Sequence, residues 1–192
     1  MKKFALFMMM FVAGIMASQA QETTTTIYRM VLHAAQEFDQ LVVSGDVTVE
    51  CRYNPEKAGY IVYHYNKEAG KKIRCYNDGS CLHIGGHSEN NGVMTRIVVF
   101  YDQPIKSIVN NGNARVFSLR LVADADSVEL VNNGSSDMRF GVVKSENALL
   151  EVNGKGNIAI KRVKIDNIET KVRGKGEVIL KKTPATTNIV KK

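Results

Sequence analysis

The densest group of potential metal ligands in this sequence is Cys75, Cys81, His83 and His87. Zinc accepts thiolate and imidazole ligands, and on a strand Cys81 and His83 would share one face because side chains alternate. The spacing matches no established zinc finger, and an oxidising compartment would favour disulfides over thiolates. We therefore expect neither a metal nor any other cofactor.

The cysteines allow several pairings. Cys75 and Cys81 flank the turn sequence at residues 77–80 (NDGS), so a hairpin could join them in a disulfide. Cys51 is the third cysteine, and its pairing with either of the others fits the sequence equally well. Reduced, buried thiols are the remaining alternative, since free cysteine packs as a small hydrophobic side chain.

Aromatic side chains offer the best candidate for a binding surface. Six of the seven tyrosines lie between residues 51 and 101, and three of them fall in one run of six residues. Tyrosines on a rigid sheet stack on sugars or anchor a protein partner. We predict a ligand-binding surface that uses Tyr60, Tyr63 and Tyr65. The alternative is that part of this set fills the core.

The sequence carries no catalytic pattern. A glycosidase needs two carboxylates about 5–10 Å apart in a cleft, but the acidic residues of the C-terminal half fall in different repeats. Gly79-Ser80 does not match a nucleophile elbow, and no helix follows the glycine turns to bind a phosphate. We predict that the protein is not an enzyme and has no catalytic residues.

Basic residues recur every twenty positions in the C-terminal half. The pairs are Lys155 and Lys175, Lys161 and Lys181, and Arg162 and Lys182. Such rows form either a solvated face or a stripe that binds anionic glycan or lipopolysaccharide. Along the whole chain the basic residues look spread rather than clustered, and no aromatic nucleic-acid motif accompanies them. We therefore predict no nucleic-acid partner.

The elements that position these residues repeat with a period near twenty. Residues 152–158 (VNGKGNI) are answered by residues 172–178 (VRGKGEV), and looser copies lie at residues 109–112 and 131–134 (both VNNG). Apolar side chains alternate on both sides of each glycine turn, which is typical of strands. A fixed short period is typical of coils that stack on one another. The sequence predicts an all-β, solenoid-like or β-helix-like fold.

Glycine and asparagine mark the corners between strands. We expect the glycines because a sharp corner needs positive φ, which glycine adopts freely. Asn110, Asn132 and Asn153 each follow the valine of their repeat, so we expect their side chains to stack as an amide ladder. Glu151 lies twenty residues before Lys171, which predicts opposite charges on adjacent strands.

The chain divides into four parts. Residues 1–20 predict a signal peptide, because a basic start and an apolar run at residues 4–16 precede small residues at the cleavage site. Residues 21–37 are expected as an N-terminal tail and residues 183–192 as a C-terminal tail. The β-solenoid domain spans residues 38–182, and the Tyr- and Cys-rich residues 51–101 form a β-hairpin insert near one end of it.

Two segments carry a resemblance to a known family. Residues 38–49 (FDQLVVSGDVTV) resemble the opening motif of the putative auto-transporter adhesin, head GIN domain family, with a Phe-Asp pair, a strand, a Ser-Gly turn and a second strand. Residues 153–158 (NGKGNI) are similar to its glycine-rich turns. The resemblance covers residues 38–182 and implies an exported, Bacteroidota-type protein with a right-handed, solenoid-like β fold. The tyrosine-rich insert departs from the family pattern, as do the Asn-Asn-Gly and Lys corners.

These observations predict an exported, non-enzymatic binding or adhesion module of the cell envelope, in the periplasm or at the cell surface. Its expected partner is a surface glycan or an envelope protein, and it can form homo-oligomers. No membrane-spanning segment is expected after signal cleavage, since the apolar run is shorter than about 20 residues. One alternative is an envelope assembly protein that self-associates through exposed sheet ends. A second is a small carbohydrate-active enzyme.

Overall fold

The computed structural model of the protein describes residues 28–33, 37–65, 73–87 and 96–192. The described chain is all-β, as predicted, and its one short 3₁₀ turn is η1 (Pro55–Lys57). The strands are β1 (Tyr28–His33), β2 (Gln40–Gly45), β3 (Thr48–Tyr53), β4 (Tyr60–Tyr65), β5 (Ile73–Asp78), β6 (Cys81–Gly86), β7 (Arg96–Tyr101), β8 (Ser107–Asn110), β9 (Arg115–Ser118), β10 (Ser127–Asn132), β11 (Met138–Val152), β12 (Ile158–Val172), β13 (Val178–Leu180) and β14 (Asn188–Lys191).

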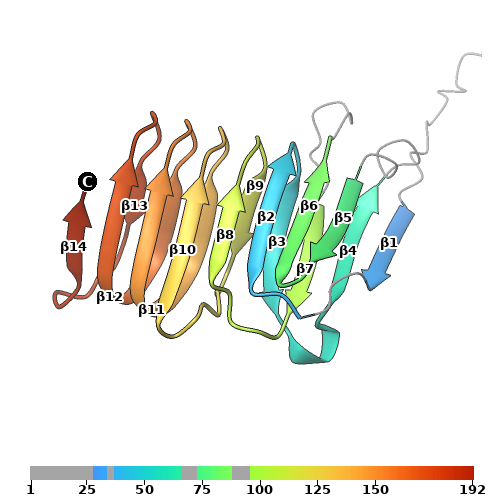
Figure 1. Ribbon diagram of the computed structural model, residues 1–192, viewed down its shortest axis with the longest axis horizontal. Helices are drawn as coiled ribbons and strands as arrows, with labels where there is room; N and C mark the ends of the chain where they lie inside the picture. Colours follow the sequence, from blue (N-terminus) through green and yellow to red (C-terminus); the bar gives the residue numbers. More distant parts are fainter. Residues whose placement is uncertain (1–27, 34–36, 66–72, 88–95) are drawn as a thin grey trace, which may run out of the picture.

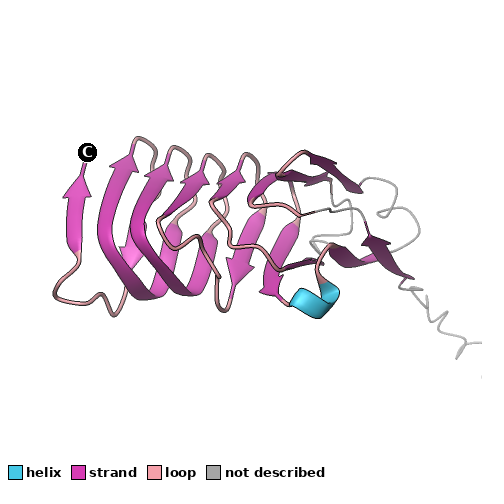
Figure 2. Cartoon of the chain, turned by 60° about the horizontal axis from the view of Figure 1, so that its bottom comes forward, coloured by secondary structure: helices cyan, strands magenta, loops and turns pink. Residues whose placement is uncertain are grey.

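The strands form one curled sheet whose two sides face each other across the core (Figure 1). One side, face A, runs β5-β6-β2-β8-β10 and continues through the C-terminal halves of β11 and β12 to β14. The other, face B, runs β1-β4-β7-β3-β9 and continues through the N-terminal halves of β11 and β12 to β13. Figure 2 shows how the long strands β11 and β12 bend from face B into face A.

Parallel pairing at a fixed offset builds both faces. Strand β11 pairs with β12 along almost its whole length, with each residue opposite the one twenty positions later, as in Leu150 and Thr170. Between β8 and β10 the offset is 22 residues, as in Ile108 and Leu130. In-register parallel pairing places equivalent side chains above one another, because both strands alternate in phase. The apolar residues of each repeat therefore line up in columns that run the length of the molecule.

The core consists of these columns. On face A, the inward side chains Leu41, Ile108, Leu130 and Leu150 are at most 1% exposed. The matching column on face B contains Val49, Val116, Met138 and Ile158, which are fully buried. Inward residues of the bend, such as Val143 and Val163, close the third side of the core. Each buried Val, Leu or Ile side chain contributes roughly 1.5–3 kcal/mol.

The predicted insert is only in part an insert. Strands β5 and β6 form the expected antiparallel hairpin, but β6 also pairs in parallel with β2, and β7 pairs in parallel with β3. Strands β6 and β7 therefore add another repeat to the two faces. Antiparallel strands complete this end, since β4 covers β7, β1 covers β4, and β5 covers β6. They cap a stack whose edge strands would otherwise lie open.

Both predicted tails contain strands of the sheet. Residues 28–33, within the expected N-terminal tail, form β1 on β4. Residues 188–191, within the expected C-terminal tail, form β14, which pairs in parallel with β12. A short turn led by Pro184 returns the chain to face A, where Thr187 Oγ1 donates to the carbonyl of Ile165 at 2.9 Å. The predicted signal peptide lies outside the described residues.

The corner glycines recur for a reason that the sequence did not indicate. A column of six glycines, Gly86, Gly45, Gly112, Gly134, Gly154 and Gly174, runs along one corner. Of these only Gly45 has positive φ, so the expected backbone conformation does not explain the rest. A Cβ atom at each of the last five would overlap the backbone of the preceding glycine. Glycine is required because successive corners stack in direct backbone contact.

The asparagines form two ladders rather than the one expected. Asn110 and Asn132 are buried on the core side, and Asn110 Nδ2 donates to Asn132 Oδ1 at 3.0 Å. The register then places Asn132 opposite Val152, so Asn153 belongs to an outer ladder. There Asn153 donates to Asn133 and Asn133 to Asn111, both at 2.8 Å. The expected alignment of Asn153 with the first two was wrong by one residue. Glu151 does lie opposite Lys171, as predicted.

The glycine column predicts a severe effect for a small substitution. Gly154→Ala should lower the free energy of unfolding by about 1–3 kcal/mol, because the added methyl overlaps the carbonyl of Gly134. Urea unfolding followed by circular dichroism measures this. The neighbouring exposed Lys155→Ala is the matched control and should stay within about 0.5 kcal/mol of the parent protein. Equal stability of the two variants would contradict the close packing of the corners.

Candidate functional site

A groove on the outer surface of face B combines apolar and basic side chains. It has a volume of about 480 Å³ and crosses β9, β11, β12 and β13. Its lining residues are Arg115, Phe117, Ser118, Leu119, Arg139, Phe140, Gly141, Ala159, Ile160, Lys161, Ile179 and Lys181. We call it the face-B groove. It contains no carboxylate, so an electropositive, partly apolar surface faces solvent.

The floor of the face-B groove is apolar where an outward face would normally be polar. The register places Phe117, Arg139, Ala159 and Ile179 in one outward column. Beside this column Leu119 is 80% exposed, the largest exposure among the large apolar side chains of the described residues. An apolar side chain held in water at the end of a strand contributes nothing to the core. It is available to an apolar ligand.

Gly141 lines the face-B groove at a close contact between two repeats. It follows Phe140 at the bend and lies against Leu119, and a Cβ atom there would overlap the Leu119 carbonyl. The backbones of two successive repeats therefore meet directly at this point, with no side chain between them. The next repeat carries Lys161 at the position equivalent to Gly141.

Four cations surround this floor. Lys161 and Lys181 are exposed and lie in adjacent repeats, since Ile160 pairs with Leu180. No ion pair with a described carboxylate is found for either lysine or for Arg115. Like charges on neighbouring strands repel each other and destabilise the sheet slightly. An anionic ligand would relieve this repulsion.

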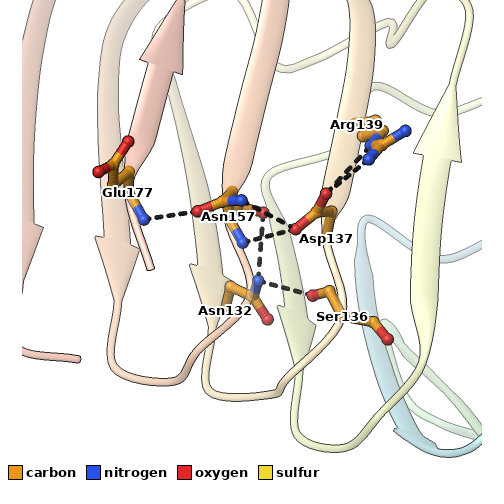
Figure 3. Close-up of polar contacts among 6 residues, drawn as sticks. All are labelled: Asn132, Ser136, Asp137, Arg139, Asn157 and Glu177. Carbon is orange, nitrogen blue, oxygen red and sulfur yellow. Dashed lines mark hydrogen bonds and ion pairs between the residues drawn. The ribbon is translucent and has the colours of Figure 1, made fainter. Parts of the chain in front are cut away.

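The fourth cation, Arg139, is held by a polar network (Figure 3). Its guanidinium donates to Asp137 Oδ2 at 2.7 Å. The other carboxylate oxygen, Oδ1, accepts the backbone N–H of Asn157 at 2.9 Å, and Asn157 Oδ1 accepts the N–H of Glu177 at 2.8 Å. Burial alone would raise the pKa of Asp137, but the hydrogen bonds from Asn157 and Arg139 outweigh it and lower the pKa. The ionised carboxylate fixes Arg139 at the edge of the groove.

A second network closes the groove at its N-terminal side. Glu50 is 3% exposed and lies opposite Phe117 in the register of β3 and β9. Arg52 Nε donates to it at 2.6 Å and Arg96 Nε at 3.0 Å. The guanidinium of Arg96 also stacks over the Phe117 ring, 5.6 Å from its centroid. Burial raises the pKa of Glu50, yet the hydrogen bonds from both arginines make the net shift downward.

The remaining large grooves differ in their charges. A groove of about 720 Å³ crosses face A, but its lysines lie in ion pairs: Lys192 meets Glu169 at 2.9 Å and Lys106 meets Asp39 at 2.8 Å. A groove of about 640 Å³ crosses the bend and mixes Lys144 and Lys164 with acidic side chains. Both are internally balanced compared with the face-B groove.

The predicted tyrosine surface is not assembled as a unit. Tyr60 is 39% exposed, whereas Tyr63 on the same strand β4 is 2% exposed and packs in the core. The backbone of Tyr65 belongs to β4, but its side chain lies outside what the structure describes. The exposed aromatic side chains also include Tyr53 and Tyr76. Period-2 alternation turned Tyr63 inward, in line with the alternative that part of the set fills the core.

The structure does not bring the two predicted disulfide partners together. Cys75 lies opposite the buried Ile84, while Cys81 lies opposite Asp78, three residues away along the hairpin. The two thiols thus point to opposite faces, and the three cysteines are free. Cys81 and His83 share a face, but within the described ranges no three His, Cys, Asp or Glu side chains gather in a metal-binding arrangement.

Sequence comparison assigns the chain to a family. The profile described as "Putative auto-transporter adhesin, head GIN domain" matches residues 37–191. The chain belongs to this family. The resemblance carried by residues 38–49 and 153–158 is thereby confirmed, with the family region extending through β14. No curated protein matches the sequence. Across the described ranges, no helix has the length and apolar character needed to span a membrane.

Solved structures share the fold. A "putative lipid binding protein" from Parabacteroides distasonis ATCC 8503 aligns with a TM-score of 0.63 at 17% identity, covering 82% of this chain and 68% of its own. A "putative adhesin" from Bacteroides fragilis NCTC 9343 aligns with a TM-score of 0.56 at 13% identity, covering 88% and 94%. A "putative adhesin" from the same Parabacteroides strain gives 0.53 at 9% identity, covering 81% and 74%.

Part of the signal for the face-B groove was visible in the amino-acid sequence. The row of Lys161 with Lys181 was visible as part of a basic stripe, but the neighbouring row of Arg162 with Lys182 does not line the groove. The apolar half was not visible, because Phe117 and Leu119 read as ordinary strand residues until the register placed them outward. In β9 the buried Val116 and Ser118 flank Phe117, so the Phe117 side chain points outward. Assigning Val116 to the core side of the strand would have indicated this outward position from the sequence.

The Glu50 network predicts a pH-dependent stability difference. The pKa of Glu50 is lower in the folded protein than its ordinary value of 4.5. The ionised Glu50 therefore makes its full contribution to the free energy of unfolding above pH 4.5, and this contribution is lost as the pH falls through the folded pKa. Glu50→Gln should cost about 1–2 kcal/mol at pH 7 and progressively less in acid. Thermal unfolding from pH 7 to 3 checks this. The exposed Glu56→Gln is the control, and a pH-independent Glu50→Gln effect would refute the role of its charge.

Burial predicts the order in which the thiols react. Burial raises the pKa of Cys51 to about 12 and that of Cys75 to about 11. It is also the main cause of the raised pKa of Cys81. Iodoacetamide at pH 8 should alkylate Cys81 first, Cys75 more slowly, and Cys51 only after unfolding, because the thiolate is the reactive form. Peptide mass spectrometry gives the order. A Cys75–Cys81 cross-linked peptide from the native protein would instead support the disulfide that the sequence suggested.

Proposed function

We propose that the protein is an exported, non-enzymatic binding module of the cell envelope that holds an anionic amphiphile in the face-B groove. The observation that carries this proposal is the exposed Leu119 beside Lys161 and Lys181, which make no ion pair with a described carboxylate. The apolar floor would receive an acyl chain, and the cations would meet a phosphate, sulfate or carboxylate head group. The exposed Leu119, Lys161 and Lys181 do not contribute to the core.

Physical magnitudes favour an amphiphile over a purely anionic ligand. Burial of apolar surface contributes roughly 25 cal/mol per Å², whereas exposed ion pairs contribute at most about 1 kcal/mol each. The floor formed by Phe117, Leu119 and Ile179 would therefore supply most of the affinity. Lys161 and Lys181 would favour a negatively charged head group over a neutral or positively charged one. A glycan without an apolar part would leave this floor in water.

The family and its structural relatives support a binding role. The family's description names adhesion, and one structure with the same fold carries the name of a lipid binding protein. No carboxylate lines the face-B groove, so this groove does not supply the carboxylate pair that the carbohydrate-active alternative needs. We retain Tyr60 as a proposed second contact for a glycan or an envelope protein, through its exposed ring.

We infer that the repeats wind as a right-handed β-solenoid. The parallel register at offsets of 20–22 residues supports stacked coils, and crossovers between parallel strands are overwhelmingly right-handed. Export through the predicted signal peptide at residues 1–20 would place the module in the periplasm or at the cell surface.

Calorimetry with a defined amphiphile tests the function. Dodecyl phosphate, kept below its critical micelle concentration, should bind, whereas inorganic phosphate and the neutral dodecyl maltoside should bind at least about tenfold more weakly. Leu119→Gln should weaken binding about fivefold, consistent with partial burial of one Leu side chain. Lys161→Gln with Lys181→Gln should reduce the preference for phosphate over maltoside.

Matched variants elsewhere on the sheet serve as controls. Leu149→Gln on face A and the pair Lys144→Gln with Lys164→Gln on the bend remove the same chemical groups outside the groove. These should bind dodecyl phosphate as the parent protein does. An equal loss of binding in the control variants would overturn the assignment of the ligand to the groove. Binding that is unchanged in Leu119→Gln would overturn it as well. Binding of a sulfated glycan with no binding of dodecyl phosphate overturns the amphiphile.

A further inference from the structure

The C-terminal end of the stack is incompletely covered. Strands β13 and β14 each pair only with β12 among the described strands, so their outer edges face solvent. The last residues of the core columns are therefore exposed to solvent: Val172 is 44% exposed and Ile189 is 43% exposed. Their equivalents one repeat earlier, Val152 and Ile168, are 0% and 1% exposed. This end presents apolar side chains and unpaired backbone groups together.

The opposite end is built differently. There the parallel strands β6 and β7 are covered by the antiparallel strands β5 and β4, and β1 covers β4 in turn. Figure 1 shows β1 and β14 at opposite ends of the long axis. Both ends have edge strands, but they differ in kind: one ends in the antiparallel strands β1 and β5, and the other in the parallel strands β13 and β14 beside the exposed Val172 and Ile189. We call them the capped end and the open end, and the exposed apolar side chains make the open end the candidate contact surface.

The open end also concentrates positive charge. Residues 153–192 contain eleven Lys and Arg and three Asp and Glu, a net charge of +8, whereas residues 21–152 contain thirteen and sixteen, a net charge of −3. The expectation of evenly spread basic residues was therefore wrong. Because successive repeats stack along one axis, this stretch of sequence becomes one end of the molecule (Figure 1).

Ion pairs within the protein neutralise only part of this charge. Arg173 meets Glu151 at 3.2 Å, and Lys171 and Lys192 both meet Glu169, at 3.2 and 2.9 Å. Lys175 and Lys191 are exposed and make no ion pair with a described carboxylate. Several cations around the open end thus remain available to an external anion.

The positive charge of the open end indicates which kind of partner can bind there. A second copy docked end to end would bring the same positive charge against itself, so the open end disfavours self-association. A small anion needs cations that converge on one point, but these lysines are spread over the corner at Lys175, the end of β14 at Lys191 and the groove edge at Lys181. An extended, flat array of negative charge fits such a distribution. Half-exposed Val172 and Ile189 would reach the head-group layer.

We propose that the open C-terminal end docks on an anionic lipid bilayer surface. Each Lys or Arg near such a surface strengthens binding by attraction to the anionic lipids, and several act together here. The inference uses Lys175 and Lys191, which lie outside the face-B groove, so it stands or falls apart from the ligand proposed for that groove. Docking at this end would hold the groove close to the lipid head groups and the capped end away from them.

Vesicle sedimentation tests the proposal. The protein should bind vesicles of phosphatidylcholine with 30 mol% phosphatidylglycerol and not vesicles of phosphatidylcholine alone, and 0.5 M NaCl should abolish binding because salt screens exposed charges. Lys175→Glu with Lys191→Glu should lower the partition coefficient more than about tenfold. Circular dichroism and the melting temperature confirm that the variant folds.

The control moves the same charge change to the capped end. Lys57→Glu with Arg74→Glu replaces two exposed cations there and should reduce binding much less. Leu149→Gln on face A, which lies outside both the open end and the face-B groove, should leave vesicle binding unchanged. Equal loss in the capped-end variant would show a non-specific charge effect and overturn the proposal. Binding to heparin without binding to the vesicles would overturn it in favour of a soluble polyanion.

Discussion

Backbone contact between the corner glycines sets the register on which the other features depend. Gly45, Gly112, Gly134, Gly154 and Gly174 each lie against the backbone of the preceding repeat, too close for any side chain. A slip of one residue would turn every inward side chain outward, because strands alternate with a period of two. The glycine column excludes such slips sterically. The buried Asn110–Asn132 hydrogen bond adds a polar constraint on the same corner.

The same register builds the outer surfaces. The outward side chains of one repeat lie beside the equivalent side chains of the next, so Lys161 and Lys181 form a row of like charge. Such rows do not stabilise the sheet, since like charges on adjacent strands repel. An exposed Leu119 beside them does not serve the core either. Features that cost stability and serve no packing role are expected at binding surfaces.

Stacking along one axis also makes the two ends unequal. The capped end uses antiparallel strands that leave their partners fully paired, with Ile61 and Ile97 buried. The open end leaves Val172 and Ile189 about half exposed, and the exposed Lys175 and Lys191 belong to the same end. Lysine on an edge opposes pairing with another copy while keeping the end attractive to anions. The protein therefore has a polarity that the fold class alone does not indicate.

The sequence by itself determined the fold class, the family and the approximate repeat, because alternation and the period near twenty are local properties of the chain. It also showed the basic rows. Only the tertiary structure decided which side of each strand faces the core, and so it turned Tyr63 inward, separated Cys75 from Cys81, and shifted Asn153 out of line with Asn132. Facing and register depend on contacts between residues twenty or more positions apart, which a single sequence does not specify.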